Sequence, residues 1–99
     1  MVVSAYILSQ EAKEDLQVFA ENIVQARLAR GWSQQEVAER ALMSRLTYRE
    51  IEKGNPKVRF LNYLSVLDLF GLTGGLRELA ASHTDEEGRR LRNIKGRHS

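Results

Sequence analysis

Apolar residues recur at spacings of three and four through residues 10–30, which is the spacing of one face of an α-helix. No proline or glycine interrupts this stretch, so it predicts one long helix or two joined helices. Ser9 is a suitable N-cap, and Gly31 suits the left-handed residue that ends such a helix. The apolar positions are Ala12, Leu16, Phe19, Ala20, Ile23, Val24, Ala26 and Leu28.

Two shorter helices are predicted next. Ser33 and Glu36 have the spacing of a capping box, in which each side chain accepts a hydrogen bond from the backbone of the other residue. The helix that starts there is short, because residues 42–44 interrupt its pattern before Ser44 caps a third helix over residues 45–53. The second helix turns Val37, Ala38 and Ala41 inward. The third has an inner face of Thr47, Tyr48 and Ile51 and an outer face of Arg45, Leu46, Arg49, Glu50 and Lys53.

The remaining pattern predicts two more helices. Glycine and proline at residues 54–56 end the third helix, and a fourth follows over residues 59–70 until Gly71 closes it. A short fifth helix over residues 76–81 is expected to cover the open end of the core with Leu76 and Leu79. Residues 2–8 form the one β-like run, for which a strand, an arm and a helix lead-in all remain open. The expected stripe of the fourth helix is Phe60, Tyr63, Leu64, Leu67 and Phe70.

Composition narrows the class of protein. Ninety-nine residues, 42% hydrophobic and 28% charged, suit a single folded domain. The absence of cysteine excludes disulfide scaffolds, thiolate zinc sites and thiol nucleophiles. His83 and His98 lie far apart in the sequence, so we expect no metal site and no cofactor. No glycine-rich phosphate loop precedes a lysine, and no cysteine is available as a nucleophile, so we expect a protein that is not an enzyme.

Targeting signals are not evident in the sequence. The apolar start has no basic lead-in and no cleavage pattern, which does not favour a signal peptide. The most apolar later stretch, residues 60–72, is far shorter than the ~20 residues that span a bilayer. We therefore expect a cytoplasmic protein.

Charge is segregated along the chain although the net charge is only +2. Residues 1–26 carry a net charge of −3 and residues 67–87 one of −4, whereas residues 27–66 carry +4 and residues 88–99 carry +5. A basic middle and a basic tail are available to a phosphate backbone, although charged side chains also simply solvate helix faces.

Two short helices joined by a tight turn, the second with a cationic outer face, have the form of a helix-turn-helix, whose second helix enters the ~12 Å wide major groove of DNA. The stretch from Ala26 to Gly54 closely resembles the Cro/C1 or Xre family of DNA-binding domains. The resemblance rests on the Ser33-Gln34 cap, the Val37-Ala38 pair, Ser44 and the Ile51-Glu52-Lys53-Gly54 ending, and it covers about half of the chain, residues 22–72.

This resemblance implies an all-α fold, a five-helix λ-repressor-like domain with an N-terminal extension and a basic tail. We expect residues 1–21 to form an arm and the start of the first helix, residues 22–81 the domain, and residues 82–99 a flexible tail that needs a partner for order. Two positions depart from the family pattern. Leu42 stands where a glycine is usual, so the turn must accept a side chain at positive φ or take another shape. Tyr48 replaces a smaller buried aliphatic, so its hydroxyl must reach a partner or the surface.

Residues 55–72 and the acidic-glycine-basic tail are similar to HipB-type antitoxins, which repress their own operon and bind a HipA-type kinase toxin. The implied function is therefore a sequence-specific repressor of that kind. Two alternatives remain: a protein-interaction module that neutralises a toxin while DNA binding is secondary, and a regulator from a phage or mobile element.

The resemblance also assigns residues to the DNA interface. Gln34 is similar to a glutamine that clamps a phosphate, although alone it would pass for a solvated residue. Arg45 and Arg49 are of the residue type that pairs with guanine, and Leu46 suits contact with a thymine methyl group. Glu50 can either accept from cytosine or form an ion pair with Lys53 or Arg49. Arg27 and Glu52 resemble a structural pair, and Trp32 is expected to cover the core. The expected DNA-binding set is Gln34, Ser44, Arg45, Leu46, Thr47, Arg49, Glu50, Lys53, Asn55 and Lys57, with Arg59 extending it.

A single helix-turn-helix contacts too few base pairs for selectivity, so a homodimer on a palindromic operator is expected. We look for its interface among exposed apolar residues at the two edges of the domain. These are Val2, Val3, Tyr6, Ile7 and Leu8, together with Leu76 and Leu79.

Overall fold

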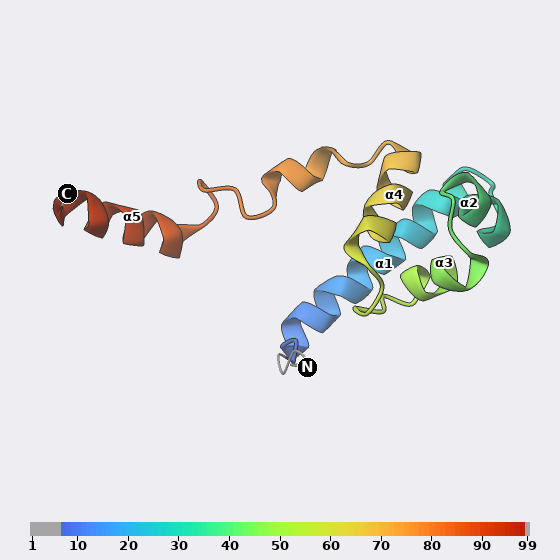
Figure 1. The fold of residues 1–99 in the computed structure, drawn as a ribbon, viewed down its shortest axis with the longest axis horizontal. Coiled ribbons are helices and arrows are strands. Elements are labelled where there is room, and N and C mark those ends of the chain that lie inside the picture. The colour runs from blue at the N-terminus through green and yellow to red at the C-terminus, as the bar shows by residue number, and fades with distance from the viewer. Residues whose placement is uncertain (1–6, 99) are drawn as a thin grey trace.

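The computed structural model describes residues 7–98 (Figure 1). Its elements are all helical in that part of the chain, which confirms the expected all-α class. They are α1 (Gln10–Ala29), α2 (Gln34–Arg40), α3 (Arg45–Glu52), α4 (Phe60–Phe70), a short 3-10 helix η1 (Gly74–Glu78) and α5 (Glu86–His98). None of the helices in residues 7–98 combines the length and apolar character of a membrane span.

The predicted caps are present. The Ser9 hydroxyl accepts from the backbone N–H of Ala12, and Ser33 and Glu36 form the complete capping box. Ser44 caps α3 in the same way by accepting from the N–H of Thr47. These bonds satisfy N–H groups that the first helical turn leaves without partners, so polar side chains determine where α1, α2 and α3 start.

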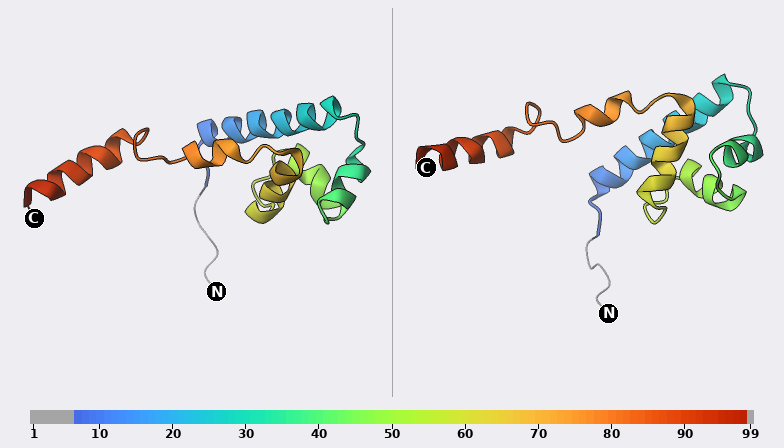
Figure 2. Two further views of the ribbon diagram at one scale, coloured as in Figure 1. Left: turned by 90° about the horizontal axis from the view of Figure 1, so that it is seen from above. Right: turned by 45° about the horizontal axis from the view of Figure 1, so that its top comes forward.

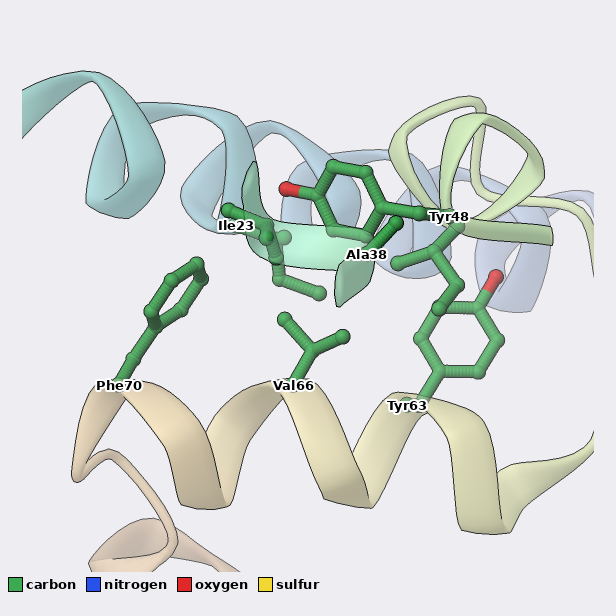
Figure 3. Packing of buried hydrophobic residues seen from close by; sticks show 8 residues of the cluster. Ile23, Ala38, Tyr48, Tyr63, Val66 and Phe70 are labelled. Atoms are coloured by element: carbon green, nitrogen blue, oxygen red, sulfur yellow. The ribbon is translucent and has the colours of Figure 1, made fainter. Parts of the chain in front are cut away.

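The core lies where α2 and α3 meet α1 and α4. α4 approaches from one side and points Tyr63, Val66 and Phe70 at Ile23 and Tyr48 (Figure 3). Packing of these side chains removes apolar surface from water and holds α3 in place. The buried cluster is Ile23, Val37, Ala38, Tyr48, Ile51, Tyr63, Val66 and Phe70.

The predicted stripe of α4 was partly wrong. Val66, absent from the prediction, is fully buried, whereas Phe60 is exposed and Leu64 and Leu67 are half-buried. Apolar residues occupy most positions around this helix, so their spacing does not define one face. Contact with α1, α2 and α3 selects the side that is buried.

One further expectation is corrected after α4. Of residues 76–81, which were expected to form a helix, residues 76–78 end the 3-10 helix Gly74–Glu78 and residues 79–81 follow it, and Leu79 is exposed. The tail contains α5, and its expected need for a partner stays a prediction. Asp85 caps α5, since its carboxylate accepts from the N–H of Gly88 at 2.9 Å, and Arg90 pairs with Glu87 one turn away. Local bonds of this kind favour the start of a helix here.

The conformation of residues 2–8 and their expected place in a dimer interface are only partly covered by the structure. Val2, Val3 and Tyr6 lie outside the described residues. Ile7 is exposed and Leu8 half-buried just before α1.

Candidate nucleic-acid interface

The turn between α2 and α3 adopts an unusual backbone conformation. Leu42 has a φ of 57°, and its side chain is 92% exposed. A side chain in this left-handed region is strained by about 1–2 kcal/mol relative to glycine. The N–H of Met43 still donates to the carbonyl of Ala38 at 3.0 Å, so the turn closes with a leucine where the resemblance leads us to expect glycine.

Glu52, in the last turn of α3, accepts hydrogen bonds from three side chains, two of which belong to other helices. Arg27 of α1 donates to both carboxylate oxygens, from Nε at 2.6 Å and from Nη2 at 3.2 Å. Gln34 at the start of α2 donates to Oε1 at 2.8 Å, and Tyr48 donates from within α3. The Arg27 and Glu52 side chains are only 13% and 8% exposed. This network therefore ties α1 and α2 to the last turn of α3.

The network shifts the acid–base properties of its members. Burial by itself would raise the pKa of Glu52, but hydrogen bonds from Arg27, Tyr48 and Gln34 outweigh it and hold that pKa below its ordinary value. Burial and the hydrogen bond to Glu52 raise the pKa of the Tyr48 phenol. Glu52 is therefore ionised and Tyr48 neutral at physiological pH, which is the pairing that the hydrogen bonds require.

The outer face of α3 carries its cationic residues into solvent. Arg45 and Arg49 are exposed one turn apart, and Leu46 between them is exposed as well. Ser44 and Thr47 bond to each other, with 2.9 Å between their hydroxyl oxygens, and close the start of the helix. The α3 surface thus presents two guanidinium groups and an apolar side chain, which suit guanine edges and a thymine methyl group.

Three residues predicted to bind DNA are linked to one another at the far end of α3. Glu50 lies 3.2 Å from Lys53, and the Asn55 amide donates to Glu50 at 3.0 Å. The hydrogen bonds from Asn55 and then Lys53 lower the pKa of Glu50. Of the two roles left open for Glu50, the helix ion pair with Lys53 is present in the structure.

The loop after α3 extends this surface. The side-chain oxygen of Asn55 accepts a hydrogen bond from the backbone N–H of Lys57 at 2.9 Å, and the Lys57 side chain is exposed. A shallow hollow of about 340 Å³ joins the loop to α3 and to the start of α4. Sequence reasoning missed Asn62, although a polar residue in an apolar helix was a signal. The lining residues are Leu46, Thr47, Glu50, Asn55, Lys57, Val58, Arg59 and Asn62.

Gly54 allows α1 to approach the end of α3. Its φ is +70°, and a Cβ there would lie 2.7 Å from the Gln17 amide nitrogen and 3.3 Å from the Ala20 Cβ. The Gln17 amide donates to the carbonyl of Lys53 at 2.9 Å. Gln17, which the sequence did not single out, thus binds the C-terminus of α3 to α1.

Gln34 and Trp32 have structural contacts. The amide nitrogen of Gln34 is bonded to Glu52, so the residue expected to clamp phosphate also braces α3. The Trp32 ring packs against Phe70 with centroids 6.1 Å apart and lies under the Arg40 guanidinium at 4.4 Å. Its carbonyl accepts from Arg27 at 3.0 Å. Trp32 therefore covers the core, as expected.

Comparison with known families decides the class of the domain. The family described as "Helix-turn-helix domain" matches residues 19–80. This chain belongs to the helix-turn-helix domain family. The match runs from the middle of α1 to just beyond η1, and the helix-turn-helix itself is α2 and α3. Membership makes the protein a DNA-binding regulator. No curated protein and no solved structure matches the chain at a significant level.

Proposed function

We propose that the protein is a sequence-specific transcriptional repressor that binds a palindromic operator as a homodimer. The observation that carries this proposal is the Glu52 network, in which Arg27, Gln34 and Tyr48 hold the last turn of α3. A recognition helix must be held rigidly for its side chains to reach particular base edges. Arg45 and Arg49 on the opposite, exposed face then read bases, while the loop cations contact phosphates.

The position of each residue along α3 decides whether it is proposed to contact a base or a phosphate. Arg45 is the first residue of α3, and Lys53 follows its last residue. Because the N-terminal residues of a recognition helix contact base edges, Arg45 is proposed to read a base. Lys53 and Lys57 are proposed to contact the backbone. Gln34, Ser44, Leu46, Thr47, Arg49, Glu50 and Asn55 complete the proposed interface.

A titration against DNA upstream of its own gene tests the proposal. Affinity should fall steeply with salt, with a log–log slope that corresponds to about four to eight phosphates per dimer. A scrambled duplex of equal length is the control and should bind about a thousandfold more weakly, or more weakly still, which is the margin that separates specific from non-specific sites. A flat salt dependence, or equal affinity for both duplexes, contradicts a sequence-specific repressor.

We further propose that the repressor is the antitoxin of a HipA-type kinase. Support comes from the similarity of residues 55–72 and of the acidic-glycine-basic tail to HipB-type antitoxins. The test is to mix the purified protein with the product of a kinase-like reading frame beside its gene. Co-elution on size exclusion and loss of kinase activity are expected. Separate elution with unchanged kinase activity contradicts the antitoxin role and leaves the repressor proposal standing.

A further inference from the structure

α5 has an apolar stripe that nothing in the described chain covers. Leu91 and Ile94, one turn apart, are 47% and 39% exposed. The helix extends away from the other elements in every view (Figures 1 and 2). The radius of gyration is accordingly 17.3 Å, whereas a compact domain of this length has one of about 13 Å. A helix of thirteen residues is marginal by itself in water, so α5 is expected to acquire a packing surface.

A surface of matching character lies on the helix-turn-helix domain. An open groove of about 450 Å³ runs between α1, α4 and η1. Leu16 and Phe19 of α1 and Leu67 of α4 are half-buried along it, and Phe60 and Leu79 are 62% and 71% exposed at its sides. A second hollow shares Leu16, Phe19 and Phe60 with the first, so the apolar surface continues past α4.

Charge distinguishes the groove from the DNA-binding face. Asp15 lines the groove, and Glu11 and Glu14 precede it on the exposed start of α1. Among residues 7–95, none of these three carboxylates belongs to an ion pair. α5 is basic, with Arg89, Arg90, Arg92 and Lys95 around its apolar stripe. An apolar groove with an acidic end is therefore complementary to a basic helix with an apolar stripe.

We propose that α5 of one protomer docks in the α1–α4–η1 groove of a second copy, with Leu91 and Ile94 against its apolar side chains. The exchange is reciprocal, so two grooves and two α5 helices form one symmetric dimer. This inference rests on the proposed dimeric repressor and identifies its interface, which leaves the α3 surface free for DNA.

Chain geometry selects a second copy as the source of the helix. Leu79 lines the groove, and only residues 80–85 separate it from α5. Six residues span at most about 20 Å, and the chain would have to reverse within them to bring α5 back over its own groove. In the structure the chain instead runs outward from η1 into α5 (Figure 2). A second domain meets the outward helix without any reversal.

Sedimentation of the full-length double variant Leu91→Ala/Ile94→Ala tests the proposal. Each truncation removes several buried methyl groups, so the dimer dissociation constant should rise about tenfold per residue. Val18→Ala, which truncates an exposed residue of α1 outside the groove, is the matched control and should leave that constant unchanged. Both alanine variants keep every basic residue of α5.

The possible results separate this interface from the proposed function. A wild-type chain that stays monomeric at high concentration overturns both the dimeric repressor and the exchanged helix. A dimer that the double variant does not weaken, or that Val18→Ala weakens equally, overturns the exchanged helix alone. A double variant that keeps the dimer but loses affinity for random DNA identifies α5 as a DNA-binding arm and also overturns it.

Cysteine cross-linking locates the contact, since the native chain has no cysteine. A mixture of an Ile94→Cys chain and a Phe60→Cys chain should form a disulfide-linked heterodimer under mild oxidation. The pair Ile94→Cys with Val18→Cys is the control and should not. The double variant Ile94→Cys/Phe60→Cys distinguishes the source of the helix. Linked dimers on a non-reducing gel support exchange, whereas a disulfide within single chains overturns it.

Discussion

The phenolic hydroxyl of Tyr48 donates a hydrogen bond to Glu52, one turn further along α3. This bond resolves the departure of Tyr48 from the family pattern, because the larger side chain fills the core and its hydroxyl reaches the carboxylate that Arg27 also binds. No buried side-chain nitrogen or oxygen in the described residues lacks a partner. The site therefore gains a third donor without leaving a polar group unsatisfied.

Tyr48→Phe tests that bond. Loss of the hydroxyl removes a hydrogen bond to a charged group, so the free energy of unfolding should fall by about 1.5–3 kcal/mol. Tyr63→Phe is the matched control, because Tyr63 donates to the neutral carbonyl of Asn55 at 2.8 Å. Its cost should be about 0.5–1.5 kcal/mol. Urea denaturation of both variants measures the difference, and equal costs would contradict a special role for the Glu52 contact.

Glu52→Ala should lower the melting temperature far more than Glu39→Ala. Removal of Glu52 leaves the largely buried Arg27 without its carboxylate, which costs about 3–5 kcal/mol. Such a loss corresponds to a shift of more than about 10 °C in a domain of this size. Glu39 is exposed and contacts only Gln35 at 3.1 Å among the side chains around it. Equal shifts of the melting temperature in the two variants would contradict a stabilising role for the Glu52 network.

Acid should destabilise the fold through Glu52. Its pKa is lower in the folded chain than the value of about 4.3 expected in the unfolded chain, so the ionised carboxylate stabilises the fold above that pH. This contribution is lost as the pH falls through the folded pKa. Stability in urea titrations should thus drop as the pH falls below about 4.3, and Glu52→Gln should reduce the drop. Glu36→Gln, at an exposed capping residue, is the control and should reduce it less. An unchanged drop in Glu52→Gln would contradict this assignment.

Arg45→Ala and Lys53→Ala should affect DNA binding differently. Loss of a base contact at Arg45 should weaken operator binding by about 1–3 kcal/mol, relax preference at one position per half-site and hardly alter binding to random DNA. Lys53→Ala should weaken both duplexes alike and reduce the salt slope by about one per protomer. Paired titrations at several salt concentrations measure both effects. If Arg45→Ala weakens both duplexes equally, α3 docks on DNA in another way.

Leu42→Gly should stabilise the protein. The leucine holds a φ of 57° and its side chain is exposed, so glycine relieves strain and loses little packing. The free energy of unfolding should rise by about 0.5–1 kcal/mol, once the greater chain entropy of glycine is subtracted. Ala41→Gly, at a φ of −89°, is the neighbouring control and should lower it. Destabilisation by Leu42→Gly would show that the leucine side chain makes a favourable contact.

Local features of the chain were determined by sequence. The capping box of Ser33 and Glu36, the cap at Ser44 and the left-handed Gly31 all involve residues within one turn of each other. Their hydrogen bonds form wherever the helix forms, so the residue types alone predict them. At Leu42 the resemblance left two alternatives open, a side chain at positive φ or a turn of another shape, and the structure has the positive φ.

Tertiary structure decided which partners distant residues found. The buried face of α4 depends on three other helices, and the spacing of an almost wholly apolar helix does not reveal that Val66 is inside and Phe60 outside. The bond from Gln34 to Glu52 arises only when α2 packs on α3, and the bond from Arg27 only when α1 packs on α3. The sequence predicts the capping residues of α1, α2 and α3. The apolar groove, in contrast, forms only where α1, α4 and η1 come together. Contacts within one turn follow from neighbouring residues, whereas contacts between helices follow from how the whole core fills space.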